Sequence, residues 1–206
     1  MSKYTLLALE GWGSTIAEAA LAVAGLPYEI ETIDPRGKGQ DRLLKLNPLG
    51  QLPTLILPDG QVMTESAAIV LYLSELKPQA GLAPPPDDPT RPEFLRWLVF
   101  LVAAIYPTFA VGDVPQKWIA GEANQRALTK GAIEQRCRNW LMVEEAVKGP
   151  WFLGERFSAL DIYLGAMTHW RPARAWFKAN CPKVYAIALK ADVHPGLTRV
   201  LKRNFE

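Results

Sequence analysis

The first third of the chain carries short runs with the spacing of β-strands. Tyr4 to Leu9 is an apolar run that suits a buried strand, and Glu29 to Ile33 alternates polar and apolar positions. Two further runs, Thr54 to Leu57 and Gln61 to Thr64, flank the sequence Pro-Asp-Gly. Because these turn residues reverse the chain between strands, the pattern predicts a β-hairpin.

Helical spacing follows the first predicted strand. Thr15 and Glu18 lie three residues apart, as in a capping box, and Gly25 suits the C-terminal cap of a helix. The pattern therefore predicts an amphipathic helix over this segment. One face of it collects the apolar residues Ile16, Ala17, Ala20, Leu21 and Ala24.

Two more helices complete the first part. A shorter and weaker pattern covers Gln40 to Leu46, and a third helix follows Glu65-Ser66, with Ile69, Val70 and Leu73 on one side. The predicted order is strand, helix, strand, helix, strand, strand, helix. This order is typical of an α/β unit with a mixed sheet.

A proline-rich segment separates this unit from a helical one. Residues 77–92 hold six of the seventeen prolines, so they form neither a helix nor a central strand. Pro92 suits the first turn of a helix that runs to about Ala110, and a second helix is predicted over Ala123 to Val147. We expect an α/β domain over 1–77, a linker over 78–90 and an all-helical domain over 91–206.

A second capping signal lies late in the chain. Ser158 and Asp161 have capping-box spacing at the entrance to an apolar helical stretch. We predict that the Asp161 carboxylate supports the first-turn amides of that helix.

Composition and charge exclude several classes of protein. The 206 residues are 49% hydrophobic, which is enough for a packed core. The net charge of +2 does not favour binding to nucleic acid or to a membrane. The apolar run Trp97 to Tyr106 is shorter than the ~20 residues that span a bilayer and indicates a buried helix. Cys137 and Cys181 form no CxxC, which indicates neither a redox pair nor a metal site. A reduced, cytoplasmic protein fits best.

Three motifs in order resemble one family. "NPLGQLPTL" at 47–55, "TESAAIVLYL" at 64–73 and "GERFSALDIYL" at 154–164 are similar to motifs of the cytosolic glutathione S-transferases. The opening "GWGSTIAE" at 11–18 looks closest to a bacterial subgroup of that family. The resemblance implies a thioredoxin-like N-terminal domain, an all-α C-terminal domain, and glutathione as co-substrate.

The same resemblance implies a residue that activates the glutathione thiol. Only the thiolate is a good nucleophile, and lowering a thiol pKa from about 8.5 to near 6.5 needs about 2.7 kcal/mol. A hydroxyl hydrogen bond to a charged group contributes roughly 1.5 to 3 kcal/mol. Ser14 lies where the family places this residue, with Thr15 in reserve, although either hydroxyl also suits a plain helix cap.

Glutathione itself would bind to the first domain. The resemblance implies that Leu52-Pro53 is a cis junction whose Leu52 backbone meets the cysteinyl part, with Gln51 assisting. Glu65 and Ser66 would hold the γ-glutamyl ammonium and carboxylate. The glycyl carboxylate is left to a basic residue, one of Arg36, Lys38 and Arg42.

The second substrate would lie between the two domains. Trp12, Tyr106, Phe109 and Trp170 are the candidate pocket residues, although aromatic stripes are more often core. Pro107 should kink or end its helix and leave the Tyr106 hydroxyl near irregular backbone.

The preferred hypothesis is a homodimeric glutathione transferase that conjugates small hydrophobic electrophiles. A glutathione-dependent disulfide reductase and a binding protein that has lost thiol activation remain as alternatives. Gly13, which offers no reactive group, favours the binding protein.

Overall fold

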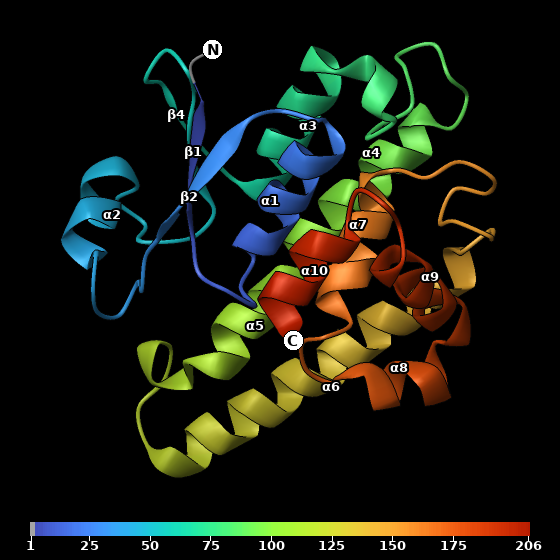
Figure 1. Cartoon of the computed structure of the whole chain (residues 1–206). Helices are drawn as coiled ribbons and strands as arrows, with labels where there is room; N and C mark the ends of the chain where they lie inside the picture. The colour runs from blue at the N-terminus through green and yellow to red at the C-terminus, as the bar shows by residue number, and fades with distance from the viewer. Residues whose placement is uncertain (1–2) are drawn as a thin grey trace.

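A four-stranded mixed sheet organises the first part of the molecule (Figure 1). The computed structural model describes residues 3–206. The strands are β1 (Tyr4–Ala8), β2 (Tyr28–Thr32), β3 (Thr54–Ile56) and β4 (Val62–Thr64), in the spatial order β2-β1-β3-β4. β1 pairs with β2 in parallel, whereas β1 with β3 and β3 with β4 are antiparallel.

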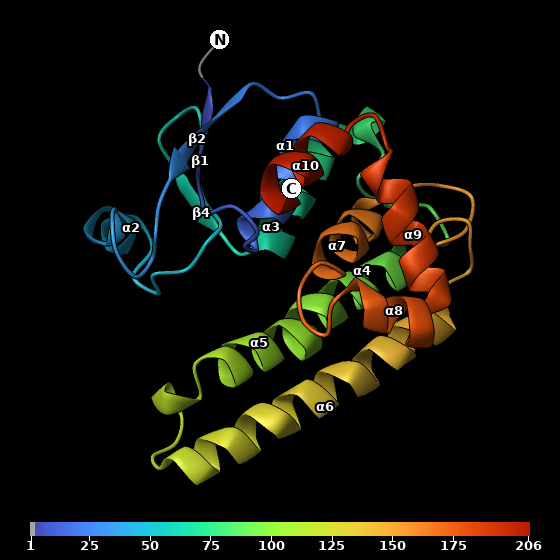
Figure 2. The same cartoon turned by 60° about the horizontal axis from the view of Figure 1, so that its bottom comes forward.

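Helices cover both faces of this sheet. α1 (Ser14–Val23) and α3 (Ser66–Leu76) lie on one side and α2 (Gln40–Leu46) on the other (Figures 1 and 2). The predicted order of the seven elements is confirmed, as is the hairpin around Pro-Asp-Gly. Every residue of the apolar face predicted for the first helix is buried, and Gly25 follows that helix at φ +63°.

The predicted capping box of the first helix is wrong. The helix begins at Ser14 with Gly13 as its N-cap, and no side chain caps it. Thr15 and Glu18 are both buried and bond to the C-terminal helix instead. Long-range partners therefore replace the local reciprocal bonds.

The described residues after α3 form helices and loops. Their regular elements are η1 (Pro78–Ala80), α4 (Arg91–Phe100), η2 (Leu101–Ile105), α5 (Tyr106–Asp113), η3 (Pro115–Lys117), α6 (Glu122–Ala146), α7 (Ala159–Met167), α8 (Arg174–Asn180), α9 (Pro182–Asp192) and α10 (Thr198–Phe205). The helix predicted over Ala123 to Val147 is present as α6.

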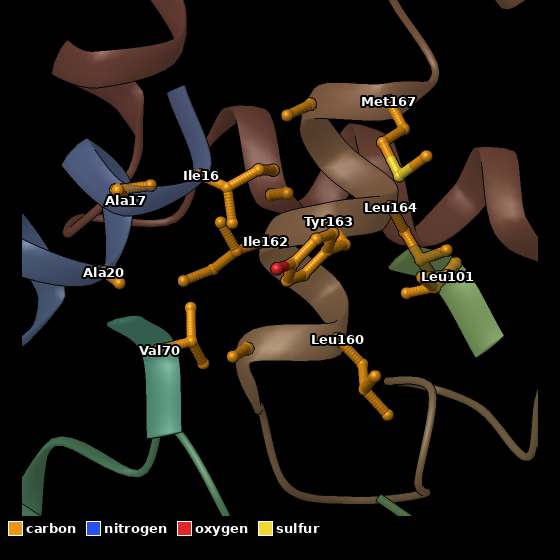
Figure 3. Close-up of a cluster of buried hydrophobic side chains, with 14 of the residues drawn as sticks. Ile16, Ala17, Ala20, Val70, Leu101, Leu160, Ile162, Tyr163, Leu164 and Met167 are labelled. Carbon is orange, nitrogen blue, oxygen red and sulfur yellow. The ribbon is translucent and has the colours of Figure 1, made fainter. Parts of the chain in front are cut away.

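Helix α7 occupies the centre of the core, and all nine of its residues are buried. Figure 3 shows its apolar side chains facing α1, α3 and the segment that carries Leu101. The Ser158/Asp161 capping box is confirmed. The Asp161 carboxylate accepts hydrogen bonds from the amides of Ser158 and Phe152, both at 2.8 Å.

The segment Arg91–Asp113 is one continuous helical stretch in which α4, η2 and α5 follow without a break. By length and composition alone it would suffice to cross a membrane. Its residues Phe94, Leu98, Leu101 and Ile105 are buried in the core. The helix continues past Pro107, and a π-helical segment, Leu101–Ile105, interrupts its α-helical pattern just before the proline.

Candidate functional site

A cavity of about 430 Å³ lies between the first loop and the helical part. Each of the four aromatic residues predicted for the second-substrate pocket lines it, so the structure brings that set together. The lining residues are Gly11, Trp12, Gly13, Arg36, Tyr106, Phe109, Ala110, Asp113, Val114, Trp170 and Arg171.

Three of the aromatic side chains form one wall through edge-to-face contacts. The Tyr106 ring centre lies 5.7 Å from that of Trp170 and 6.4 Å from that of Phe109, and Phe109 and Trp170 are 5.6 Å apart. Such perpendicular pairs match the positive edge of one ring to the negative face of another. The wall is therefore a fixed apolar surface rather than a set of independent side chains.

A buried arginine supports this wall from behind. Arg136 of α6 donates to the Thr108 hydroxyl at 2.9 Å, the Thr108 carbonyl at 2.8 Å and the Arg171 carbonyl at 3.1 Å. Its guanidinium lies 3.5 Å from the centre of the Phe109 ring. Burial lowers the pKa of Arg136 to about 10, which leaves it charged at neutral pH. Arg136 thus joins α5 to the chain just after Trp170.

The helical part also holds the Gly11 loop from two sides. The Gly11 carbonyl accepts from the Trp170 indole at 2.6 Å, and the Gly11 amide donates to Asn204 Oδ1 at 3.2 Å. Gly11 has φ +74°, a conformation that glycine adopts without steric cost. The position of Trp12 and Gly13 at the cavity therefore depends on α10 and on the loop after α7.

The hydroxyl of Ser14, the expected thiol activator, is bonded within the protein. Ser14 is buried, its hydroxyl donates to the Leu9 carbonyl at 3.1 Å, and the same oxygen accepts from the Leu9 amide at 3.2 Å. A serine hydroxyl can donate one hydrogen bond, and here the Leu9 carbonyl accepts it. Ser14 consequently joins the residue after β1 to the start of α1.

Thr15, the reserve residue, is committed as well. Its hydroxyl donates to Asn204 Oδ1 at 2.9 Å, and its side chain is fully buried. Neither hydroxyl at the start of α1 is free to meet a thiol.

The segment before β3 has the geometry that the resemblance implied. The Leu52-Pro53 peptide bond is cis. The Asn47 side-chain amide donates to the Gln51 carbonyl at 2.9 Å and fixes the bend, while the Gln51 side chain is exposed. A Cβ placed on Gly13 would lie 3.5 Å from the Leu52 carbonyl oxygen, so the Leu52 backbone lies beside the first loop.

Glu65 and Ser66 lie at the start of α3. Glu65 is exposed and has φ +64°, an uncommon backbone conformation for a residue with a side chain, of the kind that concentrates at functional sites. The Tyr163 hydroxyl donates to Ser66 Oγ at 2.8 Å, which leaves the Ser66 proton available for another acceptor. Burial is the main cause that raises the pKa of Tyr163, so it remains a donor.

The three basic residues considered for the glycyl carboxylate have different surroundings. Arg42 forms an ion pair with Glu31. Arg36 lines the cavity and stacks over Trp12, with its guanidinium carbon 5.3 Å from the ring centre. Lys38 is exposed and is not among the residues that line the cavity. Of the three candidates, Arg36 is thus the one that lines the cavity.

Three supporting residues were missed at the level of sequence: Arg136, Tyr163 and Asn204. Arg136 sits in the middle of a long polar helix, Tyr163 in a uniformly apolar one, and Asn204 near the end of the chain. No local spacing marks any of them, because each acts on residues at least 28 positions away.

Known proteins share this architecture over nearly the whole chain. A sequence profile described as "Glutathione S-transferase, N-terminal domain" matches residues 14–76. The uncharacterised GST-like protein YncG of Escherichia coli is 39% identical over 198 residues, which are 94% of this chain and 95% of that protein. This chain belongs to the glutathione S-transferase family.

Solved structures agree with that assignment. A glutathione transferase homologue from Sulfitobacter, with glutathione bound, aligns over 100% of both chains with a TM-score of 0.88 and 25% identity. A glutathione transferase from Methylococcus capsulatus aligns over 97% of both chains with a TM-score of 0.77 and 31% identity. The predicted fold class is confirmed: a thioredoxin-like N-terminal part followed by a helical C-terminal part, as in glutathione S-transferases.

Proposed function

We propose that this glutathione S-transferase-family protein binds glutathione and directs its thiol at small apolar electrophiles. The cavity between the Gly11–Gly13 loop and the wall of Tyr106, Phe109 and Trp170 is the observation that carries the proposal. An apolar cavity with a few polar groups at its edge is the usual form of a small-molecule site. Glutathione bound to the Sulfitobacter homologue supports the choice of co-substrate.

The γ-glutamyl end of glutathione would lie at the start of α3. Glu65 supplies a carboxylate for the ammonium, while Ser66 and the first-turn amides supply donors for the carboxylate. The absence of a side-chain cap on α3 supports this assignment, since the first amides of the helix are open to a ligand.

The rest of glutathione would extend toward the cavity. The Leu52 backbone would meet the cysteinyl part, with Gln51 beside it, and Arg36 would meet the glycyl carboxylate. Along this path the sulfur would lie next to Gly13, at the wall of the cavity. An electrophile held against the aromatic wall then lies in reach of the thiolate, and the products are a thioether and the departing group.

Conjugation is the reaction that this geometry favours over disulfide reduction. The residues around Gly11 to Thr15 include no cysteine that could form a mixed disulfide. The cavity wall offers apolar contact for an electrophile instead.

Two further proposals concern the state of the protein. We propose a homodimer, supported by family membership and by large apolar side chains left exposed on two helices, Leu76 on α3 and Val99 on α4. We also propose a cytoplasmic location, supported by the two free cysteines, Cys137 and Cys181. Sedimentation equilibrium tests the dimer: a mass twice that of the chain supports it, and the mass of a monomer across the concentration range refutes it.

Titration calorimetry with glutathione tests the proposed function. Wild-type protein should bind, and Glu65→Ala should lose about tenfold or more in affinity, because a charge-assisted contact is worth roughly 1.5 to 3 kcal/mol. Glu75→Ala is the matched control, since Glu75 is an exposed residue of the same helix. Parallel assays with an aryl halide and a small disulfide should show conjugation. No heat of binding, or turnover of the disulfide alone, contradicts the proposal.

A further inference from the structure

Most polar groups at the cavity wall are committed to other groups of the protein. The Trp170 indole donates to Gly11, and Arg171 pairs with Asp113 at 2.7 Å. The hydroxyls at the start of α1 are bonded to Leu9 and to α10. Within residues 3–206, the hydroxyl of Tyr106 stands apart: it is buried and makes no hydrogen bond. A buried hydroxyl without a hydrogen-bond partner is destabilising.

The Tyr106 hydroxyl is directed at the space beside Gly13. A Cβ placed on Gly13 would lie 3.5 Å from the Tyr106 hydroxyl oxygen and 3.5 Å from the Leu52 carbonyl oxygen. These are ordinary contact distances, so a methyl group on Gly13 would contact both groups without a clash. Glycine leaves that position open.

Two hydrogen bonds hold the backbone just before Tyr106. The π-helical segment η2 ends at Ile105, immediately before Tyr106. The Ala104 carbonyl accepts from Asn139 at 2.8 Å, and the Ile105 carbonyl accepts from the Thr108 hydroxyl at 2.6 Å. π-Helical segments occur often at functional sites. Here the segment precedes Tyr106, whose hydroxyl is buried and unpaired at the cavity.

Tyr163 links this position to the other end of the proposed site. Its ring centre lies 6.4 Å from that of Tyr106, and its hydroxyl donates to Ser66 Oγ. Figure 3 shows the Tyr163 oxygen directed toward the side where α1 and α3 lie. The two tyrosines therefore stand side by side, one serving the proposed γ-glutamyl end and the other unpaired near Gly13.

We propose that the Tyr106 hydroxyl donates a hydrogen bond to the glutathione sulfur and stabilises its thiolate. This inference rests on the proposed function and assigns the activating group, which Ser14 was expected to supply, to the helical part of the chain.

The chemistry requires that tyrosine keep its proton. Burial, followed by the neighbouring Tyr163, raises the pKa of Tyr106 well above its ordinary value, so the phenol is a donor at neutral pH. The thiol proton passes to water as the thiolate forms. The thiolate electron pair then forms the carbon–sulfur bond, and the leaving group, a halide for an aryl halide, departs with the pair of the bond that breaks.

Tyr106→Phe tests the proposal by removing a single oxygen atom. The protein should not lose stability, because the oxygen has no partner in the free protein. Thiolate absorbance of bound glutathione should show that its pKa rises by about one to two units. Affinity for glutathione at a pH below that of thiol ionisation should stay the same. Conjugation of an aryl halide near neutral pH should fall about tenfold or more and recover as the pH rises.

Two variants separate this role from a packing role. Tyr163→Phe removes the hydroxyl of the neighbouring tyrosine, which bonds to Ser66. We expect it to weaken glutathione binding while the bound thiol keeps its pKa. Gly13→Ala fills the open position with a methyl group at a backbone conformation, φ −57°, that alanine adopts readily. We expect it to raise the thiol pKa and to weaken glutathione binding, with the fold retained.

The outcomes distinguish this inference from the proposed function. Wild-type protein that fails to bind glutathione overturns both. Wild-type protein that binds glutathione with an ordinary thiol pKa overturns the inference alone, as does a lowered thiol pKa that persists in Tyr106→Phe. A rise confined to Tyr106→Phe and Gly13→Ala supports it.

Discussion

Helices α1 and α7 begin with similar sequence signals but acquire different partners. At α7, the Asp161 carboxylate accepts hydrogen bonds from the Ser158 and Phe152 amides, each at 2.8 Å. At α1, Thr15 and Glu18 turn away from their own helix and bond to Asn204 of α10, at 2.9 and 3.0 Å. One motif closes a local cap, whereas the other forms a contact across 189 residues of sequence.

The surroundings of the two helix starts explain this difference. α7 enters the apolar core, where the nearest donors for Asp161 are backbone amides. α1 begins beside α10, which presents Asn204 and Arg203 to it. Polar side chains of another helix therefore outcompete a local cap. The start of α1 is held by contacts within the protein, so the thiol activation that we propose falls to a residue from elsewhere in the chain.

The largest effect is expected where the cap is local and buried. Asp161→Ala leaves the buried amides of Ser158 and Phe152 without an acceptor, so the free energy of unfolding should fall by about 3 kcal/mol. Chemical denaturation measures this loss. Ser158→Ala, which keeps the carboxylate, should cost only ~1 kcal/mol. Equal losses in the two variants would show that the carboxylate is not the main part of the cap.

Stability should also depend on pH through Asp161. Burial raises its pKa from 3.8 to about 6, although amide hydrogen bonds act in the opposite direction. The native state therefore binds this proton more tightly than the unfolded state, and the resulting stability is present below about pH 4 and lost as the pH rises to about 6. Compared with Asp161→Asn, the wild type should gain about 2 kcal/mol as the pH falls through this range. A constant difference between the two proteins refutes the shift.

Asn204→Ala should weaken the long-range contact at α1. Thr15 and Glu18 lose a buried partner and the Gly11 amide loses its acceptor, so unfolding should become easier by about 1 to 2 kcal/mol. The Gly11 loop forms part of the cavity, so glutathione turnover should fall as well. Asn180→Ala on the surface of α8 is the control and should change stability by less than about 0.5 kcal/mol. An unchanged melting temperature of Asn204→Ala would show that the contacts of Asn204 do not stabilise the fold.

Sequence patterns predicted what depends on neighbours in the chain. The order of the first seven elements was predicted correctly, and the four predicted pocket aromatics line one cavity. The Ser158/Asp161 box was also predicted correctly, because its partners lie within nine residues. A sequence does not show, by contrast, that the Ser14 hydroxyl donates to the Leu9 carbonyl. The π-helical segment before Tyr106 also escaped prediction, since Asn139 of α6 helps to stabilise it.

The smallest stability effects are expected from the two hydroxyls of α1. Ser14→Ala and Thr15→Ala should each lower the free energy of unfolding by about 1 kcal/mol, because each removes a buried hydrogen bond. Urea denaturation of both variants measures the loss. An effect near zero for Ser14→Ala would mean that its bonds to Leu9 contribute nothing to the fold.

The pKa of the bound glutathione thiol in Ser14→Ala is the most direct test of the central claim, that the start of α1 is structural. Thiolate absorbance should give the wild-type pKa in Ser14→Ala and in Thr15→Ala, on protein shown to be folded. A rise of about one to two units in Ser14→Ala would contradict the account, because it would show that this hydroxyl leaves Leu9 and donates to the sulfur.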